Sequence, residues 1–280
     1  MSLRVEAAGP GTTVQDLGRF GLRAIGVGSS GAMDHASHRI AQRLVGNRES
    51  AAGIEVPLGG LRLRATGDHW IVVTGAEVPL TVGSHPADLW RPHLLHAGEV
   101  LELGFATRGI RAYVAVRGGL AVPPVLGSRS RDTLAGLGPE PLQVGDELVI
   151  GRTTLPLHLV DIAPWRVPGD HVEARVVPGP RRDMLAPEAW DLLTGETWTA
   201  SSAADRVGVR LDGPLLRHRG TAELPSEGVI PGAIQVPPSG VPTILLADGP
   251  VTGGYPVIGV VLDLDAIGQL RPGATLRLRG

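Results

Sequence analysis

The chain has 280 residues, of which 40 are glycine and 24 are proline, and it contains no cysteine. Its 26 basic residues are all arginine, so there is no lysine. These absences exclude disulfides, thiolate nucleophiles and thiolate metal sites, and also Schiff-base catalysis, a P-loop lysine and a biotin attachment site on this chain. The formal net charge of −2 gives no broad basic surface, which argues against nucleic acid as a partner.

The sequence predicts a cytoplasmic globular protein with no membrane contact. The N-terminus has no apolar core of a signal peptide, and no apolar run approaches the ~18 residues of a membrane span. High glycine and proline content beside 42% hydrophobic residues indicates many short segments joined by tight turns.

Short runs that alternate apolar and polar residues dominate the chain, and period two between glycine and proline turns is typical of half-buried strands. Three strands are each preceded by a glycine turn, at Gly98, Gly145 and Gly273. The clearest predicted strands are residues 3–6, 61–64, 70–73, 100–103, 111–116, 172–177, 243–246 and 275–278.

Two helices are expected. Asp34 can cap the first, over residues 35–45, and Gly46-Asn47 can end it. We expect His35 and His38 on its exposed polar face. The apolar face is predicted to comprise Ala36, Ile40, Ala41, Leu44 and Val45. The second helix is expected from about Pro187 to Gly195.

Two helices among many strands do not make alternating βαβ units, so the predicted fold class is mainly β. The polar, proline-containing stretch 163–170 is the expected boundary between two units. A weak sequence similarity between residues 30–34 and 202–205 suggests duplication of one β unit, with chance similarity as the alternative.

Two motifs suggest sites without the required context. Residues 26–31 fit G-x-G-x-x-G before a helix, but no clear strand precedes them and no βαβ repeats follow, which disfavours a dinucleotide site. A turn facing an anion or substrate, or a plain tight turn, remains possible there. His93 and His96 lack helical metal-ligand spacing, so we expect no metal site.

Polar clusters beside glycines are the stronger signal. Arg, Asp, Gln, Ser and Thr in such loops can bind carboxylate, phosphate or ureido groups through guanidinium forks and backbone amides. Loop-bracing ion pairs and Asx turns are the alternative for each residue. No G-x-S-x-G elbow is present. The clusters lie at residues 15–19, 128–132 and 201–206, and at Asp248 with 252–255.

Several blocks, in order and over nearly the whole chain, resemble the biotin-dependent carboxyltransferase family, also called allophanate hydrolase subunit 2 or carboxyltransferase domain subdomains A and B. Some bacterial members are named as the C subunit of 5-oxoprolinase. The most specific blocks close the chain. The matching blocks are residues 11–19, 31–34, 44–47, 54–56, 116–119, 126–130, 205–208, 223–228, 232–237, 246–248 and 252–256.

The resemblance implies two cyclophilin-like β-barrel units, residues 1–165 and 166–280. It implies a cytoplasmic subunit of an ATP-dependent 5-oxoprolinase, which hydrolyses 5-oxo-L-proline to L-glutamate. A sibling subunit of the B type is expected, with a third subunit possible, and the chain is expected to be inactive alone. ATP with Mg²⁺ would be supplied to the complex.

Within this framework the expected catalytic residues are Asp34, Asp205, Arg206 and Asp248. An aspartate would hold Mg²⁺ or accept a proton, and an arginine would neutralise phosphate. No dedicated metal site is expected on the chain. The expected substrate- or nucleotide-binding residues are Gln15, Asp16, Arg19, Ser30, Glu55, Arg117, Ser128, Arg129, Glu227, Gln235, Thr252 and Tyr255.

The chain departs from the family pattern at one loop. Relatives usually carry Asp-Arg-Gln-Thr-Thr-Gly-Gly-Tyr where this chain has Gly249-Pro250-Val251 between Asp248 and Thr252. The loss of a guanidinium and an amide suggests altered or reduced activity. A smaller departure is Val209, where relatives have an aromatic residue.

Two alternative functions stay open. One is a carboxyltransferase or allophanate hydrolase-type subunit acting on urea-derived amides, with biotin on another chain. The other is a regulatory binding partner of a kinase-inhibitor-like sibling.

Overall fold

The computed structural model describes residues 1–157, 163–165, 169–220 and 224–280. Contacts between Cα atoms divide the chain into two compact units. The first unit comprises Met1–Arg19, Ser30–Arg131 and Gly136–Val167, and the second comprises Phe20–Ser29, Asp132–Ala135 and Pro168–Gly280. Part of the expected boundary stretch, residues 166–168, lies outside the described residues.

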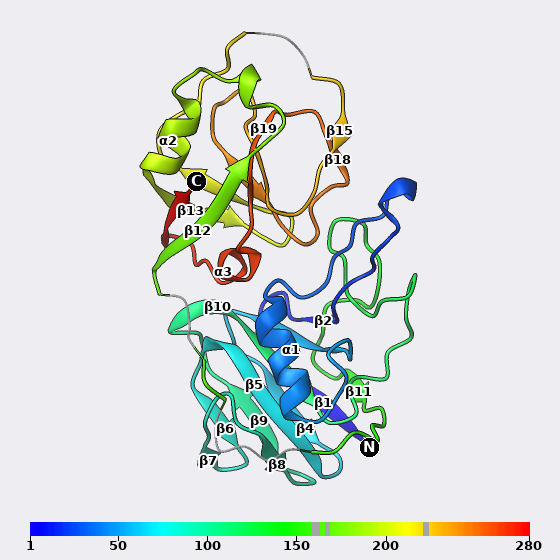
Figure 1. Ribbon diagram of the computed structural model, residues 1–280. Helices are drawn as coiled ribbons and strands as arrows, with labels where there is room; N and C mark the ends of the chain where they lie inside the picture. Colours follow the sequence, from blue (N-terminus) through cyan, green and yellow to red (C-terminus); the bar gives the residue numbers. More distant parts are fainter. Residues whose placement is uncertain (158–162, 166–168, 221–223) are drawn as a thin grey trace. The chain divides into compact units, whose positions relative to one another are not determined.

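The first unit contains two β-sheets around one apolar core (Figure 1). A six-stranded sheet has the order β11-β1-β4-β9-β6-β7, and a five-stranded sheet has the order β2-β3-β10-β5-β8. The strands of the first sheet are β1 Ser2–Ala7, β4 Arg62–Ala65, β6 Leu80–Val82, β7 His85–Pro86, β9 Val100–Leu103 and β11 Glu147–Val149. Those of the second are β2 Thr13–Gln15, β3 Gly53–Pro57, β5 His69–Glu77, β8 His93–Leu95 and β10 Arg108–Val116.

Alternation along the strands fills this core. In β5, Ile71 and Val73 belong to the core between the sheets, while Val72 belongs to a second cluster with helix α1, His35–Leu44. Val72 pairs with Ala115 of β10, and both contact the helix side of the sheet. The period of two therefore lets one sheet bury both faces.

The second unit is built on a closed barrel in the order β12-β19-β16-β17-β14-β13-β20, with β12 and β20 paired in parallel. Helix α2, Ala189–Gly195, packs against the last strand, and the indole of Trp198 donates to the carbonyl of Leu193. The barrel strands are β12 His171–Pro178, β13 Thr197–Ala204, β14 Gly208–Asp212, β16 Ala233–Gln235, β17 Thr243–Leu245, β19 Val257–Val261 and β20 Thr275–Arg279. The remaining elements are the pair β15 Glu227–Gly228 and β18 Thr252–Gly253, helix α3 Leu264–Gly268, and the 3₁₀ turns η1 Arg23–Ile25 and η2 Arg182–Met184.

The mainly β prediction is confirmed, and every strand named from the alternation pattern is present. Both expected helices are found, and α3 is an additional short one. Gly98, Gly145 and Gly273 each have positive φ, between 83° and 98°, at the turns before their strands. A residue with a Cβ is sterically strained at positive φ, which explains glycine at these three positions. None of the helices in the described ranges is long and apolar enough to cross a membrane.

The buried face of α1 differs from the prediction. Asp34 caps the helix by accepting a hydrogen bond from the Ser37 amide at 2.9 Å, as expected. However, Ala36 is exposed, and the predicted exposure of His38 is wrong, since it is 1% exposed. Ser37, His38 and Gln42 are buried with Ala41 and Leu44. Hydrogen bonds help to offset this burial: His38 Nε2 contacts the Ala51 carbonyl at 3.1 Å, and Gln42 Oε1 accepts from the Asn47 side-chain amide at 2.8 Å.

A buried polar cluster attaches α1 to the five-stranded sheet. The hydroxyl of Tyr113, from β10, donates to Glu55 Oε2 of β3 at 2.9 Å and accepts from the Asp34 amide at 2.8 Å. Glu55 Oε2 also accepts from the Met33 amide at 2.8 Å. Burial and the charges of Glu55 and Asp34 raise the pKa of Tyr113 well above its usual value, so its proton stays on the phenol. One hydroxyl thus joins two strands to the start of the helix.

Burial lowers the pKa of His38 to about 4. An unfolded histidine titrates near ~6.5, so between these values the unfolded chain binds more protons and the native state loses stability as pH falls. We expect a loss of about 3 kcal/mol between pH ~6.5 and ~4 from this group. Urea unfolding at a series of pH values measures it. The H38Q variant should lack this slope, and the exposed control H85Q should keep it. Equal slopes in H38Q and wild type would contradict the assignment.

Replacing Tyr113 by Phe removes one donor to Glu55 and the acceptor of the Asp34 amide. Because both groups are buried, Y113F should lower the free energy of unfolding by about 2–4 kcal/mol in denaturant titrations. The other tyrosine provides the control, since Tyr255 is 48% exposed. Y255F should change stability by less than about 0.5 kcal/mol. A Y113F variant as stable as Y255F would show that the cluster does not hold the helix.

Candidate functional site

In the first unit, the side chain of Asp16 is the centre of a buried hydrogen-bond network. Its Oδ1 accepts from the Gly18 amide at 2.8 Å and from the hydroxyls of Ser128 and Ser130 at 2.6 Å each. Its Oδ2 accepts from the Arg129 amide at 2.7 Å. Four donors compensate the charge of a carboxylate that is only 5% exposed. Asp16 therefore fixes the loop after β2 against the loop around residue 129.

Two more of the predicted residues reinforce this contact. The Gln15 amide nitrogen donates to Thr13 Oγ1 at 3.0 Å and to the Arg131 carbonyl at 2.9 Å. The guanidinium of Arg19, which is 2% exposed, donates to the Ser130 carbonyl. The structure thus brings together the predicted set Gln15, Asp16, Arg19, Ser128 and Arg129, and it does so chiefly through contacts that brace the loops.

The predicted residues around the start of α1 form a neighbouring cluster. Ser30 Oγ donates to the Arg131 carbonyl at 3.0 Å, and the Ala32 amide donates to the Asp16 carbonyl at 2.9 Å. Gly31 lies so close to Leu17 that a Cβ would approach its backbone to 2.8 Å, which explains this glycine of the G-x-G-x-x-G run. The run therefore packs one loop on another. Asp34 and Glu55 meet through Tyr113, as described above.

Arg117 lies apart from the Asp16 network, at the end of β10. Its guanidinium donates to the carbonyl of Val45 at 3.1 Å and to that of Leu155 at 2.6 Å. His93 and His96 have separate local partners, the Asp88 carbonyl and the Asp68 carboxylate. Within the described ranges no cluster of three metal-ligating side chains is found.

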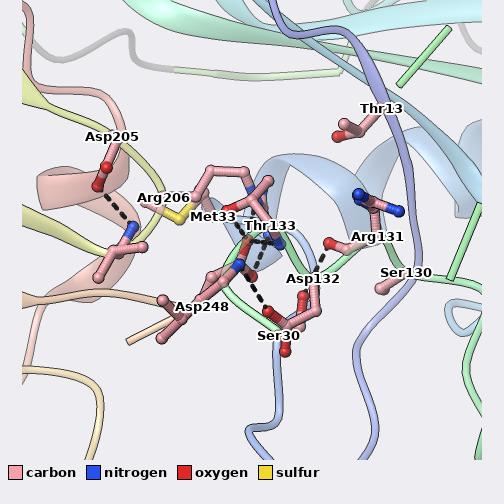
Figure 2. Close-up of polar contacts among 12 residues, drawn as sticks. Thr13, Ser30, Met33, Ser130, Arg131, Asp132, Thr133, Asp205, Arg206 and Asp248 are labelled. Atoms are coloured by element: carbon pink, nitrogen blue, oxygen red, sulfur yellow. Dashed lines mark hydrogen bonds and ion pairs between the residues drawn. The ribbon is translucent and has the colours of Figure 1, made fainter. Parts of the chain in front are cut away.

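In the second unit, Asp248 and Arg206 form a buried ion pair (Figure 2). Arg206 donates from Nε to Asp248 Oδ2 at 2.8 Å and from a terminal nitrogen to Oδ1 at 3.0 Å. Thr133 adds its amide and hydroxyl to Oδ2, at 2.9 and 2.8 Å. The Asp248 side chain is fully buried. Two predicted catalytic residues, Arg206 and Asp248, are thus in contact. Their hydrogen bonds engage both carboxylate oxygens of Asp248 and two guanidinium nitrogens of Arg206.

The remaining predicted acids of this unit have local partners. Asp205 Oδ1 accepts from the amides of Val207 and Gly208 in the turn before β14. Glu227 pairs with Arg181, whose guanidinium lowers the pKa of that carboxyl. Thr252 is exposed and pairs with Gly228 between β15 and β18. These residues do not converge with Asp248 in any described contact.

A hollow on the outer face of the barrel gathers polar side chains with spare hydrogen-bonding capacity. Arg210 of β14 pairs with Thr243 of β17, which pairs with Gln235 of β16, so the three side chains lie in a row on one face. The alternate residues Val209 and Ile244 are buried. This row and Tyr255 line a cavity of about 430 Å³. The other lining residues are Pro237, Ser239 and Val241.

Gln235 gives this hollow its strongest chemical signal. The residue is 7% exposed, and its amide nitrogen has no hydrogen-bond partner in the part of the chain that the structure describes. Gly253 packs against it, because a Cβ there would lie 2.3 Å from that nitrogen. A buried donor without an acceptor is costly, so a ligand carbonyl or carboxylate would be stabilised there.

Sequence reasoning found Gln235 and Tyr255 but missed Arg210, Thr133 and Tyr113. For Arg210 a signal existed: the run Gly208–Asp212 alternates around Val209 and Leu211, which places Arg210 on the outer face. Its position beside Gln235 depends on strand register, which a single sequence does not reveal.

The loop that departs from the family pattern is a tight turn. The Gly249 amide donates to the Leu246 carbonyl at 3.0 Å. A Cβ at Gly249 would lie 3.0 Å from that oxygen and 3.3 Å from the Val207 carbonyl oxygen. The short loop therefore suits glycine at this position and leaves Asp248 bound to Arg206.

Known proteins with similar sequences include 5-oxoprolinase C subunits and urea amidolyases. The C subunit of 5-oxoprolinase from Haemophilus influenzae is 37% identical over 270 residues, which cover 95% of this chain and 86% of that protein. The Escherichia coli protein of the same name is also 37% identical, with 94% and 85% covered. The urea amidolyase of Lachancea kluyveri is 30% identical over 99% of this chain, but the match covers 17% of that enzyme.

Solved structures share the fold. The crystal structure of TTHA0988 superposes with a TM-score of 0.91 at 35% identity, covering 100% of this chain and 55% of that one. The Kluyveromyces lactis urea amidolyase gives a TM-score of 0.90 at 30% identity, covering 99% of this chain and 18% of that one. This chain thus spans about half of one solved relative and a small part of the other. Because residues 25–280 also match the family described as carboxyltransferase domain, subdomain A and B, the chain belongs to that family.

Proposed function

We propose that this chain is a subunit of an ATP-dependent 5-oxoprolinase and acts with a sibling subunit of the B type. The observation that carries the proposal is the 37% identity to the 5-oxoprolinase C subunit, which extends over 95% of this chain and 86% of the Haemophilus influenzae protein. The name of that relative denotes one subunit of an enzyme, which supports a multi-subunit complex. The proposal also includes a third subunit, which the family resemblance implies. It further includes a cytoplasmic location, which the cysteine-free composition favours.

The hollow beside Gln235 is our candidate for the amide-binding site. 5-Oxoproline carries a carboxylate and a lactam, and the row of side chains offers a partner for each. A guanidinium such as Arg210 forms charge-assisted hydrogen bonds to a carboxylate, and the free Gln235 amide can donate to the lactam oxygen. The ring of Tyr255, which is 48% exposed, can cover the apolar face of the substrate.

The proposed chemistry activates the lactam oxygen. That oxygen attacks the γ-phosphorus of ATP, and ADP leaves. A first water adds to the activated carbon and the C–N bond breaks, with the nitrogen taking a proton, which gives glutamyl phosphate. A second water hydrolyses this acyl phosphate and releases inorganic phosphate and glutamate. The route needs positioning and charge stabilisation and no covalent protein nucleophile, which suits a chain without cysteine or lysine.

The predicted acids fit a positioning role better than a metal-binding one. The Asp16 and Asp248 carboxylates already accept hydrogen bonds from four donor groups each. Neither offers an open pair of oxygens to a hard cation. We therefore propose that Mg²⁺ is coordinated by the phosphates of the nucleotide and binds to the complex together with it. Asp205, Arg206 and Asp248 would hold loops of the second unit, and Asp34 would hold the start of α1 in the first unit.

Reconstitution with the sibling subunits tests the proposal. The complete complex should release ADP only when both ATP and 5-oxoproline are present, and glutamate should appear in equal amount. This chain alone, and the complex without it, should be inactive. ADP release that is no higher with 5-oxoproline than without it would overturn the proposal.

Relatives that are urea amidolyases favour one alternative, carboxyl transfer to urea. A lysine-free chain cannot carry biotin, so this activity would need a biotinylated carrier from another chain. The same preparation supplied with such a carrier, a biotin carboxylase to carboxylate it, bicarbonate, ATP and urea discriminates the two. Urea-dependent carboxylation without 5-oxoproline-dependent ADP release would favour the alternative.

Substitutions in the hollow should act on substrate binding. Loss of one charge-assisted hydrogen bond in R210Q should raise KM for 5-oxoproline by about tenfold or more, and Q235L should do the same or lower kcat. The matched control is R219Q, an exposed arginine outside the hollow. Steady-state kinetics of the complete complex measure both constants. An unchanged KM in R210Q and Q235L would place the substrate elsewhere.

A further inference from the structure

A second hollow, in the first unit, is lined by arginines. It has a volume of about 400 Å³ and lies where the loop after α1 meets the end of β10 and the segment after β11. Its lining carries three guanidinium groups and three hydroxyls but no carboxylate. The residues are Asn47, Arg48, Ser50, Ala51, Gly118, Arg129, Arg152, Thr153, Thr154 and Leu155.

The walls of this arginine-lined hollow are tied together by side chains. The Asn47 amide donates to the Val116 carbonyl at 2.8 Å and its oxygen accepts from the Gly118 amide at 2.8 Å. Thr153 Oγ1 donates to the Gly46 carbonyl at 3.0 Å. Arg117, behind the wall, joins the carbonyls of Val45 and Leu155. These hydrogen bonds hold the walls in place before a ligand binds, so binding costs little conformational entropy in the walls.

Among the described residues, the arginines of the hollow form no ion pair. Arg48 and Arg152 are exposed, and neither forms an ion pair within the described residues. The neighbouring carboxylate of Glu49 pairs with Arg43 and Arg39 instead. Arg129 Nε donates to the Val122 carbonyl at 2.6 Å, a neutral acceptor, and its guanidinium forms no ion pair in the part of the chain that the structure describes. Three like charges in one concavity repel each other and attract an anion.

We propose that this hollow binds the phosphate chain of a small molecule, with the di- or triphosphate of a nucleotide as the ligand class. Guanidinium forks match phosphate oxygens in pairs, and a polyphosphate presents enough oxygens for three arginines at once. The hydroxyls of Ser50 and Thr154 add donors to the rim. The inference rests on the proposed function, in which ATP is a reactant, and deepens it by assigning the binding of the phosphate chain to this chain and to this hollow.

Calorimetric titration of the full-length chain tests the site. The ligands are inorganic pyrophosphate, ATP with and without Mg²⁺, and adenosine. We expect pyrophosphate and ATP to bind, with an affinity that falls as salt rises, and adenosine not to bind. The R48Q/R152Q variant, altered only at exposed positions, should bind both at least about tenfold more weakly. ATP binding much tighter than pyrophosphate would identify the nucleotide as the source of the phosphate chain, and equal binding would identify the phosphate chain alone.

The matched control is R4Q/R91Q, which removes the same charge from exposed positions outside the hollow. It should bind like the wild type, and thermal melting should show both variants folded. Absence of pyrophosphate and ATP binding at low salt, or equal binding by R48Q/R152Q and wild type, would overturn the inference. Failure of the hydrolase proposal would appear differently, as binding to this chain without 5-oxoproline-dependent ADP release from the complex.

Discussion

The buried carboxylate of Asp16 is the constraint on which the loops of the first unit depend. It accepts hydrogen bonds from its own loop and from Ser128, Arg129 and Ser130, more than 110 residues later in the chain. A buried charge is tolerated only when donors surround it, so all four contacts have to form together. The Asp16 carbonyl then accepts from the Ala32 amide, two residues before the cap of α1. One residue, through its side chain and its backbone carbonyl, thereby joins three segments.

Asp248 follows the same rule in the second unit, where Arg206 and Thr133 occupy both of its oxygens. Because these two carboxylates are engaged by protein donors, they are less suited to bind a ligand than the polar clusters of their loops indicated in the sequence. Acids with every oxygen engaged hold structure, whereas groups with spare donors, such as the Gln235 amide, can bind. The candidate binding groups of this chain are therefore arginines and amides, such as Arg210 and Gln235, rather than the buried acids.

The sequence predicted the strands well because alternation and glycine turns are local signals, readable within a few residues. It predicted the cap of α1 for the same reason. It failed on the buried face of that helix, since His38 is buried by partners such as the Ala51 carbonyl that are brought in by the fold. It named Gln235 but not Arg210, because their proximity depends on the register of three strands.

The absence of lysine has a structural counterpart. A planar guanidinium can donate to two acceptors at once, and the structure uses this repeatedly: Arg206 on Asp248, Arg117 on two carbonyls. An ammonium has three donors but not this planar, parallel geometry, so lysine would not reproduce the paired bonds of Arg206 to the two oxygens of Asp248. The same property makes an arginine without a protein partner a strong anion binder. Arg48 and Arg152 are exposed arginines of this kind, which is why the proposed phosphate site is built on them and not on the buried acids.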